Sequence, residues 1–317
     1  MTHTLDNERP AVPATAAVPA TEAVPATPSG ETGGQEWSPR RFELRRPVRF
    51  LVRRPGLVLS AVLVAGVVLA AFWPDAISSR DPLHGVPEQG FRPPGPGHWF
   101  GTDELGRDLF TRVVHGAALS LKATLVAVAV AFAAGGLIGL VAGFAGRWVE
   151  DVLMRFVDVL LSIPALFLSL AVVTALGYGA VKVAVAVGIA SVATFARVMR
   201  AEVLRVRQAV FVEAARSCGV RWYGVLGRHV LPNAIGPVLV LATLEFGTAI
   251  LAVSSLSFLG YGTPPPAPEW GSLISQGRNY LANAWWLTTL PGLTIAAVVL
   301  ATNRIARALD GEWGRHD

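Results

Sequence analysis

The sequence predicts an all-α membrane protein with six transmembrane helices. Of its 317 residues, 52% are hydrophobic and only 15% are charged, which is well below the charged fraction of a soluble domain. The apolar residues gather in runs of about 18 or more, long enough to cross about 30 Å of hydrocarbon as a helix. These runs lack period-2 alternation, and a helix satisfies its own backbone, so helices are favoured over a barrel.

Six apolar runs define the predicted spans. They cover residues 55–73, 121–145, 157–177, 181–198, 234–258 and 286–303. We expect residues 55–310 to form one six-helix transmembrane domain that includes a long cytoplasmic connection at 199–233. The run 181–198 is short and closely follows Gly177 and Gly179. Pro164 in the third run is expected to kink its helix.

The residues before the first span divide into a tail and a basic segment. The tail, 1–39, is rich in Pro, Ala and Thr and repeats AVPAT at 11–15, 17–21 and 23–27. It has too little apolar surface to offset its ordering entropy, so we expect a disordered cytoplasmic tail, with a docking segment as the alternative. Residues 40–54 form a basic juxtamembrane segment. A cleaved export signal is disfavoured, although Arg40-Arg41 resembles a twin-arginine type, because 39 residues precede it and the apolar run is long.

The distribution of arginine sets the expected orientation. All but two of the 27 basic residues are Arg, and they flank apolar runs, which argues against a nucleic-acid-binding face. Basic residues dominate 40–54 and 199–233, whereas 74–120 and 259–285 are neutral or acidic. The positive-inside bias therefore places both termini and the 199–233 connection in the cytoplasm, which an even number of spans allows.

The connection 199–233 is the first candidate functional segment. Its upstream part has apolar residues at helical spacing: Met199, Val203, Val206 and Val210. Gly219 provides a turn point because glycine adopts positive φ freely, and Pro232 closes the segment. We expect two short helices hinged at Gly219 on the cytoplasmic membrane face. An interfacial amphipathic helix without a partner is the alternative.

The spacing within this connection resembles the EAA signature of ABC-importer permeases. Glu213-Ala214-Ala215 is followed after three residues by Gly219 and then by Leu231-Pro232. The text RHVLPNA is close to the version in dipeptide and oligopeptide permeases. Three other segments agree with it: GTDELGRD (101–108), DVLLSIP (158–164) and LSFLGYG (256–262). The resemblance covers about residues 50 to 303 and is to the C-type permease subunit of the dipeptide/oligopeptide/nickel family.

The resemblance implies a type I ABC importer permease fold in a bacterial inner membrane. It also implies a set of partners: a homologous permease subunit, two cytoplasmic ATPase subunits, an extracytoplasmic substrate-binding protein and the lipid bilayer. The chain would need no cofactor, since ATP would be bound by the ATPases, and it contains no GxxxxGK[ST], HExxH or GxSxG motif of an enzyme. A scaffold or passive channel subunit with no ATPase is the alternative. The cargo, whether a peptide, nickel or another solute, stays open.

The resemblance also assigns roles to residues of the connection. Those expected to couple to the ATPase are Glu213, Ala214, Ala215, Gly219, Leu231 and Pro232. Glu213 would be the polar anchor, Ala214 and Ala215 would allow close approach, and Gly219 would make the turn. The segment would act as a lever between the ATPase and the spans.

Three residues are candidates for the translocation path: Asp158, Pro164 and Glu245. Glu245 lies near the middle of the fifth run, where an acid costs about 3 kcal/mol on insertion scales, so it should face protein or a water-filled cavity. In the resembling family this position is usually small, and the common glutamate falls at Val253. The functional hypothesis is that Glu245 lines the path and favours cationic or amine-bearing cargo. A pair with an Arg or a hydrogen-bond donor on another helix is the alternative.

The segment before the second span carries paired charges. Asp103 is expected to cap a helix and to pair with Arg107, and Asp108 is expected to pair with Arg112, each at i,i+4.

Small residues suggest two further assignments. Gly135, Gly139 and Gly143 are spaced by four, which favours close helix packing within the subunit over a gate-lining role. Cys218 is the only cysteine, so no internal disulfide can form and a metal site built on cysteine is disfavoured. We expect a small buried residue at this position, not a reactive thiol.

Overall fold

The computed structural model describes residues 55–313, with side chains as far as residue 308. The predicted tail and the basic segment 40–54 lie outside the described residues. Within 55–313 the chain is helical apart from its connections, and the only β-type pairing is two isolated bridges between residues 95 and 108. The all-α prediction is confirmed.

Five long helices form the body of the described region. They are α2 (Pro55–Phe72), α3 (Leu109–Ala145), α6 (Ala180–Arg207), α9 (Leu231–Phe258) and α11 (Trp286–Trp313). The shorter α-helices are α4 (Arg147–Ser162), α5 (Ala165–Leu176), α7 (Val210–Ser217), α8 (Trp222–Gly224) and α10 (Trp270–Gly277). Single turns complete the set: η1 (Pro74–Ala76), η2 (Pro87–Gln89), the π-helical η3 (Val225–Val230) and η4 (Arg278–Tyr280).

The helices long enough to span a membrane allow the six spans that the sequence predicts. Five helices of the described region are long and apolar enough to cross a bilayer, and the bent pair α4–α5 makes a sixth if it counts as one span. Pro164 does more than kink this span, because α4 ends before it and α5 leaves at 96°. Ile163 has φ −95° and ψ 127°, the extended conformation that a following proline favours, since its ring disfavours the helical one.

The glycines of α3 serve packing within the subunit. A Cβ atom on Gly139 would lie 2.3 Å from the carbonyl oxygen of Ala196, and one on Gly135 would lie 2.4 Å from that of Val192. Real Cβ atoms do not approach backbone oxygens so closely, so α3 and α6 can touch only where α3 has no side chain. This contact favours the packing role that the spacing predicted over a gate-lining role.

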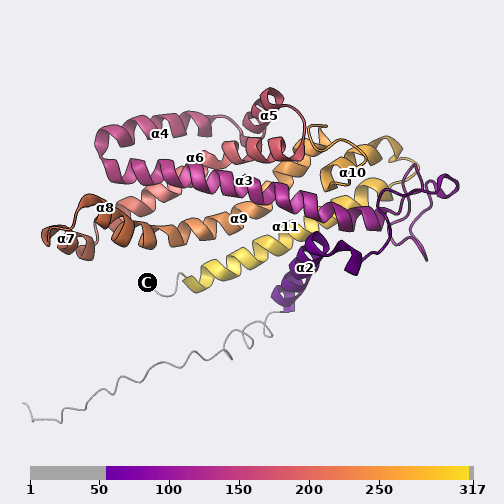
Figure 1. Cartoon of the computed structure of the whole chain (residues 1–317), viewed down its shortest axis with the longest axis horizontal. Helices are drawn as coiled ribbons and strands as arrows, with labels where there is room; N and C mark the ends of the chain where they lie inside the picture. Colours follow the sequence, from indigo (N-terminus) through magenta and orange to yellow (C-terminus); the bar gives the residue numbers. More distant parts are fainter. Residues whose placement is uncertain (1–54, 314–317) are drawn as a thin grey trace, which may run out of the picture. The chain divides into compact units, whose positions relative to one another are not determined.

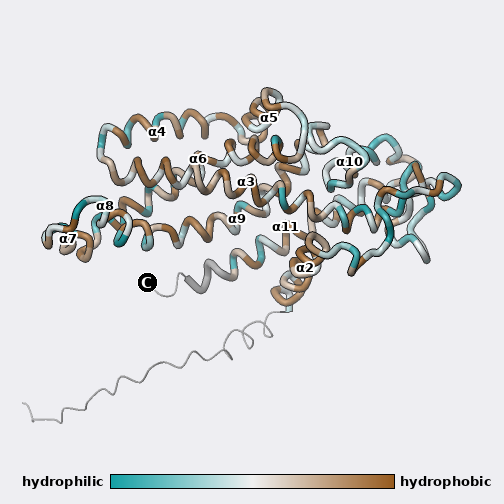
Figure 2. The backbone as a smooth tube through the Cα atoms, viewed as in Figure 1, coloured by the Kyte–Doolittle hydropathy of each residue, from teal (hydrophilic) through white to brown (hydrophobic). Residues whose placement is uncertain are grey.

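Two polar regions lie at opposite ends of the bundle. In Figure 1, α7 and α8 lie at one end, and the 74–108 connection and α10 lie at the other. Hydrophobic residues follow the long helices between them, whereas hydrophilic residues concentrate in the 74–108 connection (Figure 2). Because the long helices run between these ends, the two regions face opposite sides of a membrane that the helices span.

Candidate functional site

The helix α7 presents the EAA residues at the surface of one end of the bundle. Val212 is its only buried residue and packs with Val206, Val225 and Val230. Glu213 and Ala214 are exposed, and Ala215 is partly exposed. The carboxylate of Glu213 makes no hydrogen bond or ion pair with the described residues. The surface is therefore open to a partner.

Gly219 makes the turn that was predicted from the sequence. Its φ is +78°, in the left-handed region that L side chains rarely adopt, and nothing lies within 4 Å of a Cβ built on it. The N–H of Gly219 donates to the carbonyl of Arg216 at 2.9 Å, and that of Val220 donates to Ala215 at 3.1 Å. Glycine is thus needed here for its backbone conformation, not for space.

The second predicted short helix does not exist as a separate element. Residues 222–258 run as one helix through α8, η3 and α9, so Pro232 lies inside a helix and does not close the segment. Pro232 has no backbone N–H to donate to the preceding turn. That turn is the wider, π-helical η3. The side chain of Asn233 supplies a donor there, to the His229 carbonyl at 2.7 Å. Leu231 is half-buried and Pro232 is exposed.

Two other expectations for this segment are wrong. Met199, Val203 and Val206 are buried as the periodicity predicted, but Val210 is 81% exposed. The reason is that α6 ends at Arg207 and Val210 begins a separate helix, α7, so the periodicity of α6 does not continue to it. Cys218 is exposed, not buried, because it caps α7 immediately before the turn.

Of the candidate path residues, Asp158 lies in the second half of α4 and Pro164 lies at the break between α4 and α5. Arg197 of α6 donates through Nη2 to Asp158 at 2.8 Å, and both side chains are more than half exposed. A second pair joins the same helices, since Arg200 Nε donates to Glu150 over 2.8 Å. Pro164 is exposed at the break. The charge of Asp158 is therefore matched within the chain, and a role in the path stays a prediction for both residues.

Glu245 is half-buried on α9 beside a narrow pocket between α3, α6 and α9, whose polar lining includes Ser191. Its Oε2 accepts a hydrogen bond from Thr248 Oγ1 at 2.8 Å. The donor therefore lies one turn along the same helix, whereas the alternative prediction placed it on another helix.

At the opposite end of the bundle, the charge pairs differ from those that the sequence predicts. Asp108, not Asp103, caps a helix: its carboxylate accepts from the backbone N–H of Thr111 at 2.9 Å and so begins α3. Asp103 pairs with Arg107 at 2.7 Å, as predicted, but in a loop where it also accepts two backbone N–H groups. Arg112 lies 3.7 Å from Asp103 and does not pair with Asp108.

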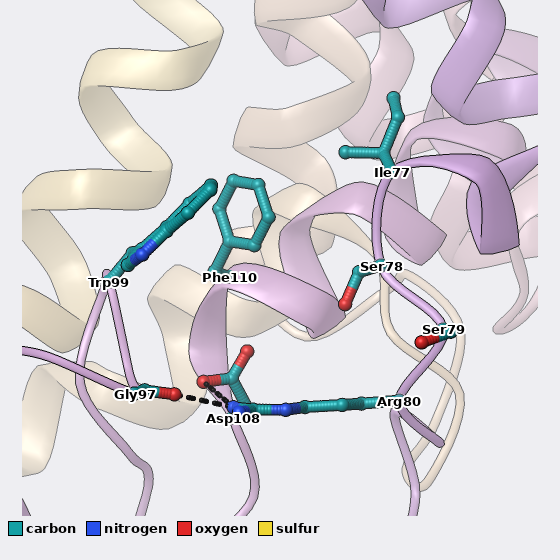
Figure 3. A pocket seen from close by; sticks show the side chains of 8 residues that line it. All are labelled: Ile77, Ser78, Ser79, Arg80, Gly97, Trp99, Asp108 and Phe110. Atoms are coloured by element: carbon teal, nitrogen blue, oxygen red, sulfur yellow. Dashed lines mark hydrogen bonds and ion pairs between the residues drawn. The ribbon is translucent and has the colours of Figure 1, made fainter.

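Asp108 instead joins the loop to the start of α3. His98 Nδ1 lies 2.8 Å from its Oδ1, and Arg80 Nη1 lies 3.4 Å from the same oxygen. Arg80 also donates to the carbonyl of Gly97 at 2.5 Å. A pocket of about 260 Å³ opens beside this network, between Trp99 and Phe110 on one side and residues 77–80 on the other (Figure 3). Its charges are already matched, which indicates a structural role in ordering the loop.

A buried acid at this end was missed in the sequence. Glu269 is fully buried and caps α10, where it accepts the backbone N–H groups of Gly271 and Ser272 at 3.0 Å each. Burial raises the pKa of this carboxyl, and the two backbone donors oppose the shift only in part. An acidic residue directly before Trp270 and Gly271 is typical of a helix N-cap. This pattern could have identified Glu269 in the sequence.

The raised pKa of Glu269 predicts a pH effect on stability. The folded chain holds the proton of Glu269 more tightly than the unfolded chain does. The protonated carboxyl therefore contributes to the free energy of unfolding below pH about 4.5, the ordinary pKa, and this contribution is lost as the pH rises through the raised pKa. We expect the difference in Tm between the natural protein and Glu269→Gln to fall across this range, measured by thermal unfolding in detergent. A difference in Tm that stays constant with pH would contradict a shifted pKa. The other carboxylates are the same in both proteins, so their effects on the pH dependence of Tm cancel in the comparison.

The fold and these surfaces define a multi-pass membrane protein with an exposed short helix, α7, and the Gly219 turn at one end of the bundle. Residues 135–314 match the family described as binding-protein-dependent transport system inner membrane component, and the chain belongs to this family. It is a permease subunit and not itself an enzyme, and the predicted resemblance to ABC-importer permeases is confirmed.

Individual relatives agree over most of the chain. A dipeptide transport system permease of Alkalihalophilus pseudofirmus is 37% identical over 80% of this chain and 83% of its own length. A probable D,D-dipeptide transport system permease of Escherichia coli K12 is 36% identical over 83% and 88%. A glutathione transport system permease of Pectobacterium atrosepticum is 36% identical over 82% and 87%.

A solved structure supports the fold alone. A crystal structure of an amino acid ABC transporter with histidines superposes with a TM-score of 0.51 at 19% identity, covering 64% of this chain and 95% of that one. The family membership and the named relatives, and not this likeness, favour the ATP-driven permease over the alternative of a scaffold or passive channel.

Proposed function

We propose that this chain is the C-type permease subunit of an importer for peptides or a similar small solute. Its relatives are named for dipeptides, D,D-dipeptides and glutathione, which share a short peptide backbone. It would form half of the translocation path, with a homologous permease subunit forming the other half. An extracytoplasmic binding protein would deliver the cargo.

The observation that carries the coupling role is the exposed surface of α7. Two ATPase subunits would bind the ATP, and one would receive Glu213, Ala214 and Ala215 in a cleft. The long helix 222–258 begins at the Gly219 turn and continues into the bundle. A displacement of α7 would therefore be passed to α9 through the short turn at residues 218–221 alone.

The orientation follows from charge. The α7 end of the bundle includes Arg205, Arg207, Arg216, Arg221 and Arg228. The positive-inside bias puts this end and both termini in the cytoplasm and the 74–108 connection outside the cell membrane. The chain itself would need neither a metal nor another cofactor.

The proposal is tested by purifying the tagged chain from its own cells in mild detergent. A second permease and a nucleotide hydrolase should co-purify, and the reconstituted complex with its binding protein should import a labelled dipeptide only when ATP is on the α7 side. Recovery of the chain without any hydrolase would contradict the proposal.

A further inference from the structure

Glu245 occupies a place where an acid needs a partner. It lies near the middle of α9, about 20 Å from either end at 1.5 Å per residue, far from the headgroup regions that the helix ends would reach. A carboxylate at such a depth is costly unless it is paired or reached by water. The helix retains it although the flanking residues Leu244 and Phe246 are apolar.

No cation of the described residues meets this acid. The ion pairs between residues 55 and 308 include Asp158–Arg197 and Glu150–Arg200 on neighbouring helices, but none includes Glu245. The pocket beside it is lined by α3, α6 and α9 with small and apolar side chains and Ser191. The hydroxyl of Thr248 compensates only part of the charge.

Glu245 lies at the border between a buried and an exposed face of α9, because Ala249 one turn on lines the same narrow pocket whereas Thr248 is exposed. On the same turns, Gly247 and Ala249 are buried, and Gly247 lies against Asn303 of α11. Thr248 is exposed, and its hydroxyl holds Glu245 Oε2 at 2.8 Å. Because Thr248 is exposed, the carboxylate oxygen that it holds lies at this exposed border, where a group outside the subunit can reach it.

We propose that Glu245 and Thr248 form a subsite on the membrane-embedded face of α9 that binds the positive group of a cationic cargo. The inference rests on the proposed function, since only a translocated solute brings a cation to this depth repeatedly. Glu245 contributes the charge, and Thr248 holds it in position. The subsite favours passage of cationic cargo over neutral cargo of the same size.

A cation on the partner permease is the competing occupant. It would neutralise Glu245 permanently, and its loss would weaken the contact between the two permeases. A cargo subsite instead leaves assembly unchanged and alters which solute passes, so the two occupants differ in assembly and in selectivity.

The test uses the complete transporter in proteoliposomes and two labelled probes of similar shape, alanyl-lysine and alanyl-norleucine. Dividing each variant's uptake ratio by that of the natural protein removes the preference of the binding protein. We expect Glu245→Gln to lower the lysine-to-norleucine ratio about tenfold, the effect of losing a hydrogen bond to a charged group. Glu245→Asp should keep part of the preference.

Thr243→Val is the matched control. Thr243 is exposed on the same helix and donates only to the carbonyl of Val240 at 2.7 Å, so its replacement should leave the ratio unchanged.

Three results would overturn the subsite. They are an unchanged ratio in Glu245→Gln, an equal loss for both probes, and separation of the two permeases on purification of this variant. Failure of the natural complex to import either probe, despite bound ATPases, would also overturn it while leaving the coupling proposal intact. Absence of the ATPases would refute the proposed function itself.

Discussion

Gly219→Val is expected to abolish ATP-dependent uptake while leaving the chain folded in the membrane. The residue has φ +78°, where an L side chain costs about 1–2 kcal/mol and a β-branched one costs more. The helix α7 is only 8 residues long and buries Val212 alone, so rotation of α7 is the easiest way to relieve the strain. The measurement is uptake by reconstituted complexes containing equal amounts of the permease.

Gly219→Asn is the matched control, because asparagine tolerates the left-handed conformation. A Cβ at this position meets nothing within 4 Å, so the two variants differ in backbone strain and not in contact with the bundle. Asn should retain most of the uptake. Equal uptake by Val and by the natural protein would refute the rigid turn.

Gly139→Ala is expected to destabilise the transmembrane bundle by about 2 kcal/mol through overpacking. The new Cβ would lie 2.3 Å from the carbonyl oxygen of Ala196 and 2.8 Å from the Cβ of Met199, and backbone cannot yield as a flexible side chain can. The helices α3 and α6 must separate, which should lower the Tm in detergent and the amount of folded chain.

The control lies three residues earlier on the same helix. A Cβ on Gly136 would meet only the end of the Met199 side chain, at 3.6 Å, which is an ordinary contact. Gly136→Ala should therefore be neutral or stabilising, because alanine is the better helix former by about 1 kcal/mol. Equal Tm losses in the two variants would show that helix propensity, not the approach of α6, governs this face.

The long elements could be predicted because hydropathy alone marks a membrane helix. The predicted runs recover α2, α6, α9 and α11, and the glycine spacing anticipates how α3 meets α6. The predicted span began at residue 121, but α3 begins at Leu109. Its first turns were missed because they contain the polar residues Arg112 and His115. Arg112 lies 3.7 Å from Asp103, and His115 lies 3.5 Å from Asp75. Hydropathy along the sequence does not reveal these partners.

At the candidate site, too, features set by one residue could be predicted, whereas features set by packing between helices could not. The Gly219 turn follows from one residue's backbone freedom, so the sequence predicted it. The merging of the second short helix with α9 depends on the π-helical turn before Pro232, which hydropathy does not mark. Burial of Glu269 and exposure of Cys218 depend on which helices pack above them, so residue type alone led to the wrong expectation for Cys218 and to none for Glu269.

The most direct measurement of the coupling role uses Cys218 as it stands. It is the only cysteine of the chain, it is exposed, and it directly follows α7. A photoactivatable maleimide on Cys218 in native membranes should cross-link the chain to an ATPase subunit, and Cys218→Ser should give no product. A membrane-impermeant maleimide that reaches Cys218 from outside intact cells, or cross-links that never include a nucleotide hydrolase, would contradict the assignment of α7 as the ATPase-binding element.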